Sequence, residues 1–417
     1  MSKKPIAITG IGMITSLGQG KQENWAKLSG GQSGIHRLTR FSIDNMRTTV
    51  GGSVDTVKIE EMTAPALSHA MARLAILEAL GESGLENADA FPGQLFLAAP
   101  PVEQEWTQRY ELAGNVPGEG RSYADMLANA PTDRDDLHDD FLYGTIADRL
   151  ADEFGTEGSP ITLSTACASG ATAIQLAVEA IRRGACKAAM SVGTDGSMHP
   201  ESLIRFSLLS ALSTDNDDPA KTAKPFSANR GGFVMAEGAA ALILEDVDHA
   251  KERGATILGY IRGCGEAADT FHRTRSDPSG KAIIRCLESA LEDAGMSASD
   301  IDYINAHGTG TPENDKMECM AIESVFGDAA KTTPVSSNKS MIGHTLTAAG
   351  AIEAAFSVLT LKNQLLPPTI NYDEPDDAIP LDVVPNEARP AEIKSIMSNS
   401  FGFGGQNVCL ILSSEPE

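Results

Sequence analysis

Short apolar runs alternate with longer, Ala-rich stretches along most of the chain. The short runs are rich in β-branched residues and are bounded by turn-forming residues, which is typical of buried strands. The longer stretches carry apolar residues at helical spacing, and Gly81, Gly184 and Gly295 follow the last turn of three of them. The pattern predicts strands at Ile6–Thr9, Gln94–Ala98, Ala188–Val192, Ala241–Leu244, Ile257–Arg262, Tyr303–Asn305 and Cys409–Leu412, and helices at Ala66–Leu80, Ser169–Arg183, Lys281–Ala294, Asp315–Phe326 and Ala348–Lys362.

This alternation favours an α/β fold with mostly parallel strands. A new strand is expected to begin at Gly254–Ala255, so we predict an N-terminal half at 1–254 and a C-terminal half at 255–417. A weak internal similarity supports the division. Leu163–Cys167 and Val335–Lys339 are both Ser/Thr-rich strand ends that lead into small-residue helices.

Residues 99–142 interrupt the alternation. The segment is irregular and acidic, and its acidic residues include Asp133, Asp135, Asp136, Asp139 and Asp140. We expect an insertion that leaves the core and acts as a cap. Its charge fits a solvated acidic loop equally well, so both interpretations stay open.

Net charge narrows the classes of partner. The chain has 417 residues, with 33 Lys and Arg against 57 Asp and Glu, which gives a net charge of −24. Phosphate binding needs clustered cations, so this charge argues against a nucleic-acid scaffold and against docking on anionic lipid. We expect neither kind of partner.

The sequence predicts no membrane span and no secretion signal. No apolar window reaches the roughly 18 residues that a spanning helix needs. Thr9, Gly10 and Gly12 interrupt the apolar N-terminal stretch, which is therefore interpreted as a first strand. The six cysteines form no C-x-x-C pair, so we expect neither a zinc knuckle nor a disulfide framework, and a reducing, cytoplasmic setting.

Cys167 is the strongest candidate for chemistry. A strand-like run, Pro160–Ala166, precedes it and an Ala-rich helix follows, which places the thiol near a helix N-terminus. There the helix dipole lowers a thiol pKa and favours the thiolate. Small neighbours leave room for a bulky thioester. A lone cysteine among alanines is also compatible with an inert core residue.

Two histidines lie in polar, glycine-rich surroundings at predicted strand ends. His307 precedes Gly308, and His344 follows Gly343. In α/β proteins active sites lie at such strand ends, and glycine permits the close approach of a ligand. We expect both histidines to accompany the thiol, although either alone could be structural.

A third glycine-rich segment, residues 398–407, precedes the last predicted strand. Successive N–H groups in such a loop can form an oxyanion hole, and a tight turn is the alternative. Gly10 and Gly12 lack the third glycine of a dinucleotide fingerprint, because Thr15 takes its place. The chain also lacks the P-loop and zinc-protease motifs.

Together these segments resemble the signatures of β-ketoacyl-[acyl-carrier-protein] synthases. The resemblance extends from Ile6 to the C-terminus and is weakest at about 40–145. Each motif alone is weakly specific, but five in order are highly specific. They are Thr165–Gly170, Lys224–Val234, Asn305–Thr311, Lys339–His344 and Asn399–Gly405.

The resemblance implies the thiolase fold, with two similar βαβαβαββ halves in a five-layer αβαβα arrangement, normally as a homodimer. Family members with a Cys-His-His set elongate acyl chains, and those with Cys-His-Asn start them from acyl-CoA. His344 therefore points to an elongating synthase. Cys167 would carry the acyl chain, and His307 and His344 would stabilise the enolate formed when malonyl-carrier protein loses CO2. The N–H groups of Cys167 and Phe403 would hold the tetrahedral oxyanion.

Other roles follow from the same resemblance. Acyl carrier protein would be the partner, delivering acyl and malonyl thioesters on its phosphopantetheine arm, and no metal or redox cofactor would be needed. We expect a Lys339–Glu318 ion pair that positions the site, with a helix-end salt bridge as the alternative. The remaining assignments are Asp315 as a second acidic partner, Thr309 and Thr311 on the phosphopantetheine arm, and Phe403 as a rotating gate of the acyl pocket.

The chain departs from the family pattern at the expected carrier-docking surface. Acyl carrier proteins are acidic, and family members meet them with Lys and Arg. Here the corresponding stretch contains Glu60 and Glu61, so either Lys58, Arg73 and Arg205 suffice or the carrier is specialised. Within the motifs, the unusual residues are Ser227, Ala236, Thr347 and Gln406.

Several functions stay open at this point. The leading interpretation is a 3-oxoacyl-[acyl-carrier-protein] synthase of fatty-acid or related lipid synthesis. A polyketide-type ketosynthase, a thiolase-like enzyme and a chain-length-factor-like partner subunit are the alternatives, the last of which usually lacks the cysteine. Without the resemblance, a Cys-His hydrolase is the generic expectation.

Overall fold

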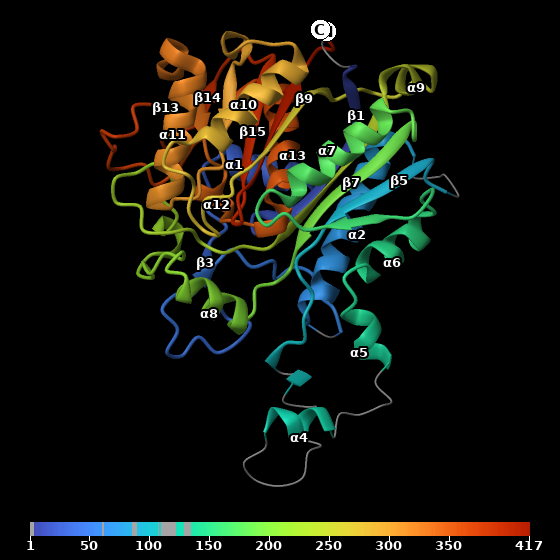
Figure 1. Cartoon of the computed structure of the whole chain (residues 1–417), viewed down its shortest axis with the longest axis vertical. Helices are drawn as coiled ribbons and strands as arrows, with labels where there is room; N and C mark the ends of the chain where they lie inside the picture. Colours follow the sequence, from blue (N-terminus) through green and yellow to red (C-terminus); the bar gives the residue numbers. More distant parts are fainter. Residues whose placement is uncertain (1–3, 61, 86–89, 107, 110–121, 129–134) are drawn as a thin grey trace.

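The computed structural model describes residues 4–60, 62–85, 90–106, 108–109, 122–128 and 135–417 (Figure 1). Its strands are β1 (Ile6–Thr15), β2 (Gly18–Gln19), β3 (His36–Arg37), β4 (Val50–Gly51), β5 (Gly93–Ala98), β6 (Ile161–Leu163), β7 (Ala188–Asp195), β8 (Gly238–Asp246), β9 (Gly259–Ala268), β10 (Tyr303–Asn305), β11 (Pro334–Ser336), β12 (Leu365–Leu366), β13 (Asp382–Val383), β14 (Arg389–Pro390), β15 (Ser395–Phe401) and β16 (Gln406–Ser413). Its α-helices are α1 (Lys21–Ser29), α2 (Ala64–Ser83), α4 (Tyr123–Ala128), α5 (Asp135–Asp140), α6 (Thr145–Phe154), α7 (Ser169–Arg182), α8 (Pro200–Leu208), α9 (Val247–Glu252), α10 (Lys281–Ala294), α11 (Pro312–Phe326), α12 (Lys339–Ile342) and α13 (Ala349–Asn363).

The main sheet consists of two runs of strands with the same internal order. One run is β6-β5-β7-β8-β1, and the other is β11-β10-β15-β16-β9 with β13 at its edge. In both runs three neighbouring strands are parallel, and the last strand of the half, β8 or β16, is antiparallel to its neighbours. The runs join where Ile6–Ile8 pairs with Gly259–Ile261. This repeated order confirms that the fold contains two similar halves.

Two helices, α7 and α13, form the layer between the runs. Their chains approach so closely that a side chain on Gly170 would lie 2.5 Å from the Ala351 nitrogen, and one on Gly350 would lie 2.5 Å from the Ala171 nitrogen. The largest core cluster surrounds these helices. Helices α2 and α6 pack on the outer face of the first run, and α10 and α11 on that of the second. The five-layer thiolase-like α/β arrangement is thus confirmed.

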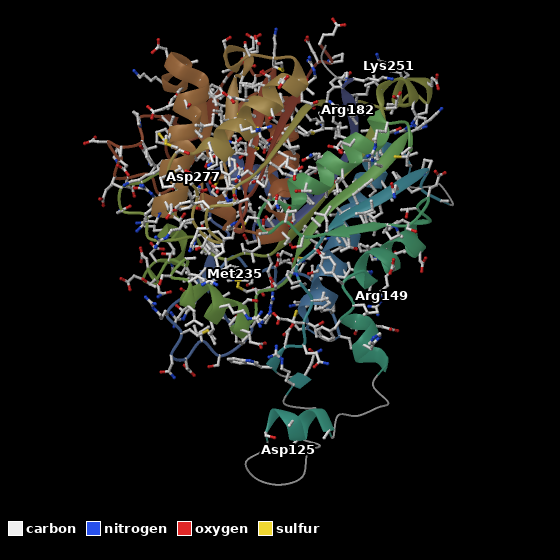
Figure 2. All side chains as sticks on the ribbon, in the orientation of Figure 1. Asp125, Arg149, Arg182, Met235, Lys251 and Asp277 are labelled. Carbon is white, nitrogen blue, oxygen red and sulfur yellow. The ribbon has the colours of Figure 1, made fainter. Side chains whose placement is uncertain are left out.

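An ion pair links the middle layer to an outer layer. Arg182, labelled in Figure 2, ends α7 and donates from Nη1 to Asp293 of α10 at 2.7 Å. The same guanidinium donates to the carbonyl of Arg262 on β9 at 2.8 Å. The far end of α7 is therefore fixed against the second half of the molecule.

The predicted strands and helices are all present, but their bounds are shifted, most of all at the ends of β1 and β9, which continue six residues further than predicted. One helix end is wrong. Gly81 lies inside α2, which continues to Ser83 and ends at Gly84 with a left-handed φ of 73°. The helix continues past Gly81 to Ser83, which is buried and donates its hydroxyl to the Leu80 carbonyl at 2.9 Å. The division at 254/255 stays a prediction.

Described parts of the 99–142 insertion project away from the body of the molecule. In Figure 1 helix α4 lies at the lower end of the molecule, and α5 lies between α4 and α6. Asp140 forms an ion pair with Arg149 of α6 at 2.6 Å. Asp133 lies outside the described residues, and the role of the insertion as a cap stays a prediction.

None of the described helices combines the length and apolar character that crossing a membrane requires. The thiols of Cys167, Cys186, Cys286, Cys319 and Cys409 are free.

Candidate active site

A strained turn between β6 and α7 presents Cys167. Ala166 has a left-handed φ of 50°, a conformation that costs energy for a residue with a Cβ. Ser169 holds the turn, because its hydroxyl accepts from the Thr165 N–H at 2.8 Å and donates to the Ala166 carbonyl at 2.6 Å. Only 8% of Cys167 is exposed. The turn therefore aims a nearly buried thiol out of the strand end.

Both candidate histidines come to this thiol from the other half of the fold. His307 follows β10, and His344 follows α12. The Cys167 sulfur and one ring nitrogen of each histidine all lie within 4.8 Å of one another. The two imidazole rings meet edge to face, with centroids 5.3 Å apart. A thiol and two imidazoles at this spacing could bind a soft cation such as Zn²⁺, or could surround a single thioester group.

Burial keeps both imidazoles neutral. It lowers the pKa of His307 and of His344 well below the ordinary value, and the nearby Lys339 charge lowers both further. The Leu346 N–H points to Nδ1 of His344 at 3.3 Å, and the Lys339 ammonium lies 3.4 Å from Nδ1 of His307. Nδ1 is therefore the acceptor in each ring, and the ring proton is on Nε2. Each histidine offers an Nε2–H donor to a ligand.

The thiol itself is protonated at rest, which corrects the expectation of a thiolate. Burial raises the pKa of Cys167 to about 11, although the Phe403 N–H and the Lys339 charge both favour the ionised form. Desolvation of the charged sulfur exceeds the effect of the helix N-terminus, because the thiol is almost fully enclosed.

Labelling of Cys167 by iodoacetamide should accelerate steeply with pH. Because the pKa is about 11, the thiolate fraction rises about tenfold per pH unit between pH 7 and 9. The measurement is the rate of carbamidomethylation of the Cys167 peptide by mass spectrometry. A rate that is flat across this range would mean that the thiolate is already formed and that the helix N-terminus prevails.

Lys339 pairs with Glu353, not with Glu318 as expected. The ammonium of Lys339 contacts the carboxylate of Glu353 on α13 and donates to the His307 carbonyl at 2.7 Å. Both side chains of the pair are almost fully buried. Burial raises the pKa of Glu353, and the Lys339 charge opposes that rise. The pair fixes the backbone that carries His307, which is more than a helix-end salt bridge would do.

Glu318 and Asp315 instead hold the histidine loop through its backbone. Glu318 accepts from the N–H groups of His307 and Gly308, each at 2.8 Å. Asp315 accepts from Gly310 at 3.2 Å and from Phe226 at 2.8 Å. Both carboxylates are buried, which raises their pKa values against the opposing effect of these N–H groups. They shape the loop between β10 and α11 without touching the thiol.

The glycine-rich segment is the turn between β15 and β16, and it lies beside Cys167. The Phe403 N–H lies near the Cys167 sulfur and lowers the pKa of the thiol against the effect of burial. Gly404 and Gly405 have φ values of 91° and 92°, and a side chain on Gly405 would meet the Asp269 carbonyl at 1.9 Å. The ring of Phe403 is half-buried against an apolar cluster that includes Phe233 and Leu346. The segment thus places both a backbone N–H and an aromatic ring beside Cys167.

These residues line one cavity of about 460 Å³, here called the Cys167 cavity. Cys167, His307, His344 and Phe403 contribute to its wall. Thr309 and Thr311 line it as well, with their hydroxyl oxygens 2.9 Å apart. None of the described residues of the 99–142 insertion does so.

Two buried acids, Glu353 and Asp195, were not predicted from the sequence as part of the site. Glu353 is the single charged residue in the buried part of α13, Ala349–Leu361, and that isolation was its available signal. Asp195, at the end of β7, accepts from Thr347 through both its N–H and its hydroxyl. The unusual Thr347 thus has a partner. The Ser227 hydroxyl lies 2.9 Å from Oδ1 of Asn229 and 3.0 Å from the Glu374 carbonyl oxygen, and its one proton can go to either.

The sequence matches two family descriptions. Residues 3–79 and 113–250 match "Beta-ketoacyl synthase, N-terminal domain", and residues 258–373 match "Beta-ketoacyl synthase, C-terminal domain". Among curated relatives, a 3-oxoacyl-[acyl-carrier-protein] synthase 2 of Coxiella burnetii is 36% identical, with 99% of each chain covered. A putative polyketide beta-ketoacyl synthase 1 of Streptomyces halstedii is 34% identical, over 99% of this chain and 98% of that protein.

Solved structures agree with the fold and the family. A beta-ketoacyl synthase from Burkholderia phymatum superposes with a TM-score of 0.84 at 31% identity, covering 99% of this chain and all of that one. A ketosynthase described in complex with a type II PKS acyl-carrier protein and bound to the hexaketide gives a TM-score of 0.89 at 30% identity, with 99% and 100% coverage. These matches confirm the resemblance noted in the motifs. The chain belongs to the β-ketoacyl synthase family of acyltransferases.

Proposed function

We propose that the protein is an elongating 3-oxoacyl-[acyl-carrier-protein] synthase that performs a decarboxylative Claisen condensation on Cys167. The observation that carries the proposal is the meeting of Cys167, His307 and His344 around one cavity. A thiol gives the acyl-enzyme, and two neutral Nε2–H donors suit a thioester oxygen that becomes negative.

In the first step the acyl chain moves from carrier to enzyme. The Cys167 sulfur attacks the acyl thioester, the bond to the pantetheine sulfur breaks, and the proton of Cys167 leaves with the departing thiol. The tetrahedral oxyanion is held by the N–H groups of Cys167 and Phe403, the latter of which already lies at the sulfur.

In the second step the malonyl group enters the Cys167 cavity on the phosphopantetheine arm of a second carrier protein. The malonyl carbon–carbon bond to the carboxylate breaks, CO2 departs, and the electron pair becomes an enolate. His307 and His344 donate to the enolate oxygen through Nε2–H. Lys339 and Glu318 position His307 and its loop, and Asp315 shapes the same loop, as supporting residues.

In the third step the enolate carbon attacks the acyl-Cys167 carbonyl. The carbon–sulfur bond breaks, Cys167 takes up a proton, and a 3-oxoacyl chain two carbons longer remains on the carrier. Loss of CO2 drives the sequence, so the proposed reaction calls for no redox cofactor. In this proposal Thr309 and Thr311 bind the phosphopantetheine arm, and their position in the cavity wall supports that role.

A type II polyketide ketosynthase is the second candidate. Relatives at similar identity include both fatty-acid and polyketide synthases, and the ketosynthase with a TM-score of 0.89 is described as bound to a hexaketide. Another similar structure is described as a ketosynthase/chain length factor. Because this chain has the nucleophile, we propose that it is a catalytic subunit. We also propose that it works as a homodimer in the cytoplasm.

Purified protein alone, given acyl- and malonyl-carrier protein, distinguishes these functions. We expect one two-carbon extension per acyl chain, read by mass spectrometry of the carrier. Chains extended repeatedly without reduction would indicate the polyketide function. Activity that appears only with a second subunit would contradict the homodimer.

Replacement of Phe403 by alanine should change which acyl chains reach Cys167. The ring of Phe403 lines the cavity beside Cys167, so its loss removes the proposed gate. We expect a shift in the relative acylation rates of short and long chains, with a smaller effect on thermal stability. Acylation rates for a length series and the melting temperature check this, and an unchanged chain preference would remove the gate role.

A further inference from the structure

Two arginines without partners stand at the mouth of the Cys167 cavity. Arg273 and Arg275 lie on the loop between β9 and α10, both are exposed, and both line the cavity. Neither side chain has an ion-pair or hydrogen-bond partner within the part of the chain that the structure describes. Such free cations are notable in a chain with a net charge of −24.

The Lys and Arg side chains that the sequence predicts to contact the carrier already bind other groups of this chain. Arg73 pairs with Glu153 at 2.6 Å, and Arg205 forms a two-pronged pair with Glu103. Lys58 donates to the Asp55 carbonyl at 3.0 Å. Because Arg73 and Arg205 pair with acids of this chain, their positive charge is largely neutralised and attracts an acidic partner only weakly.

The loop is built so that its own acids do not neutralise the arginines. Asp269 is buried and accepts from the N–H groups of Phe271 and Asp277. Asp277, labelled in Figure 2, pairs with Lys281 at 2.9 Å. The Gly404 N–H donates to the Arg273 carbonyl at 2.7 Å, which fixes the arginine backbone beside the Phe403 turn.

Exposed apolar residues accompany the charges. Phe271 on the loop is 56% exposed, and Leu208 and Leu209 at the end of α8 are 81% and 47% exposed. Leu209 lines the same cavity as Arg273 and Arg275. A patch that combines free cations with exposed apolar side chains is typical of a binding surface for a protein partner.

We propose that Arg273 and Arg275, with Phe271 and Leu209, form the surface on which the acidic acyl carrier protein docks. The inference rests on the proposed function, because it assumes substrates that arrive on a carrier. When a thioester at the end of a phosphopantetheine arm reaches Cys167, the carrier itself must sit at the mouth of the cavity. Opposite charges there steer association and oppose the repulsion from the rest of the chain.

One acid opposes the arginines. Glu313, at the start of α11, is exposed and lines the same mouth. It must repel an acidic carrier, so its removal should act in the opposite direction to removal of the arginines. The pair of changes separates a specific charge effect from general damage to the loop.

The test uses three variants. The first carries both Arg273→Glu and Arg275→Glu, the second carries Glu313→Gln, and the control carries Arg183→Glu. Arg183 is an exposed arginine at the far end of α7, roughly 20 Å along the helix from Cys167. At low salt we expect the double variant to lose about tenfold in kcat/KM for acyl-carrier protein, through KM. Glu313→Gln should gain, and Arg183→Glu should stay near wild type. Added salt should bring wild type toward the double variant.

Small thioesters show whether the two arginines act on the carrier protein or on its phosphopantetheine arm. Acylation of Cys167 by an acyl-pantetheine and by an acyl-phosphopantetheine should be unchanged in the double variant, because neither carries the protein. An equal loss with acyl-phosphopantetheine would overturn the docking surface and assign the arginines to the phosphate of the arm. Wild-type kinetics of the double variant with the carrier would also overturn it. Failure of wild type to condense any carrier-bound pair would instead refute the proposed function.

Discussion

Cys167→Ser will lose condensation by at least about 1,000-fold, with the fold intact. Serine keeps the size of the side chain, the strained turn at Ala166 and the N–H of residue 167. It replaces the thiol by a hydroxyl that ionises far less readily, and the histidines carry their protons on Nε2 and offer it no base. Product formation from acyl- and malonyl-carrier protein measures the loss.

Cys186→Ser is the matched control for this change. Cys186 is a half-buried free thiol outside the Cys167 cavity, so its serine variant should elongate like wild type. Melting temperatures equal to that of wild type would show that neither variant disturbs the fold. Elongation retained by Cys167→Ser would remove Cys167 as the nucleophile.

His344→Asn will impair loss of CO2 much more than acylation of Cys167. An asparagine oxygen can still accept from the Leu346 N–H, but the Nε2–H donor disappears. Removing one donor to a developing oxyanion typically costs about 100- to 1,000-fold. We therefore expect that loss in CO2 release from malonyl-carrier protein.

Acylation in the same variant separates the two roles of the site. It uses the N–H groups of Cys167 and Phe403, so the rate at which an acyl adduct forms should change only a few-fold. Intact-mass spectrometry of the variant with acyl-carrier protein provides this rate. Collapse of acylation with CO2 release unaffected would mean that the role of His344 is misassigned.

The repeated halves could be predicted because local patterns carry them. Strands and helices follow from apolar periodicity, and the similarity between Leu163–Cys167 and Val335–Lys339 marks equivalent turns after β6 and β11. Cys167, His307 and His344 could be selected because glycines and small residues surround them. Their meeting across the two halves depended on the family resemblance, since no local pattern specifies it.

The partner of Lys339 could not be predicted in the same way. Glu318 and Glu353 both lie on helices, and the choice between them depends on whether α11 or α13 brings its carboxylate to the Lys339 ammonium in the folded chain. The prediction that Cys167 is ionised was wrong for a related reason. The helix N-terminus is visible in the sequence, but the enclosure that raises the thiol pKa arises from the tertiary packing around the site.

The most direct test follows the mass of the enzyme through one catalytic cycle. The protein is incubated with acyl-carrier protein, freed of excess substrate, and then given malonyl-carrier protein. We predict an acyl adduct on the Cys167 peptide that persists in buffer and disappears when malonyl-carrier protein is added, with a 3-oxoacyl product two carbons longer. No adduct, or an adduct that water removes equally fast without malonyl substrate, would contradict the account, and the second result would indicate a hydrolase.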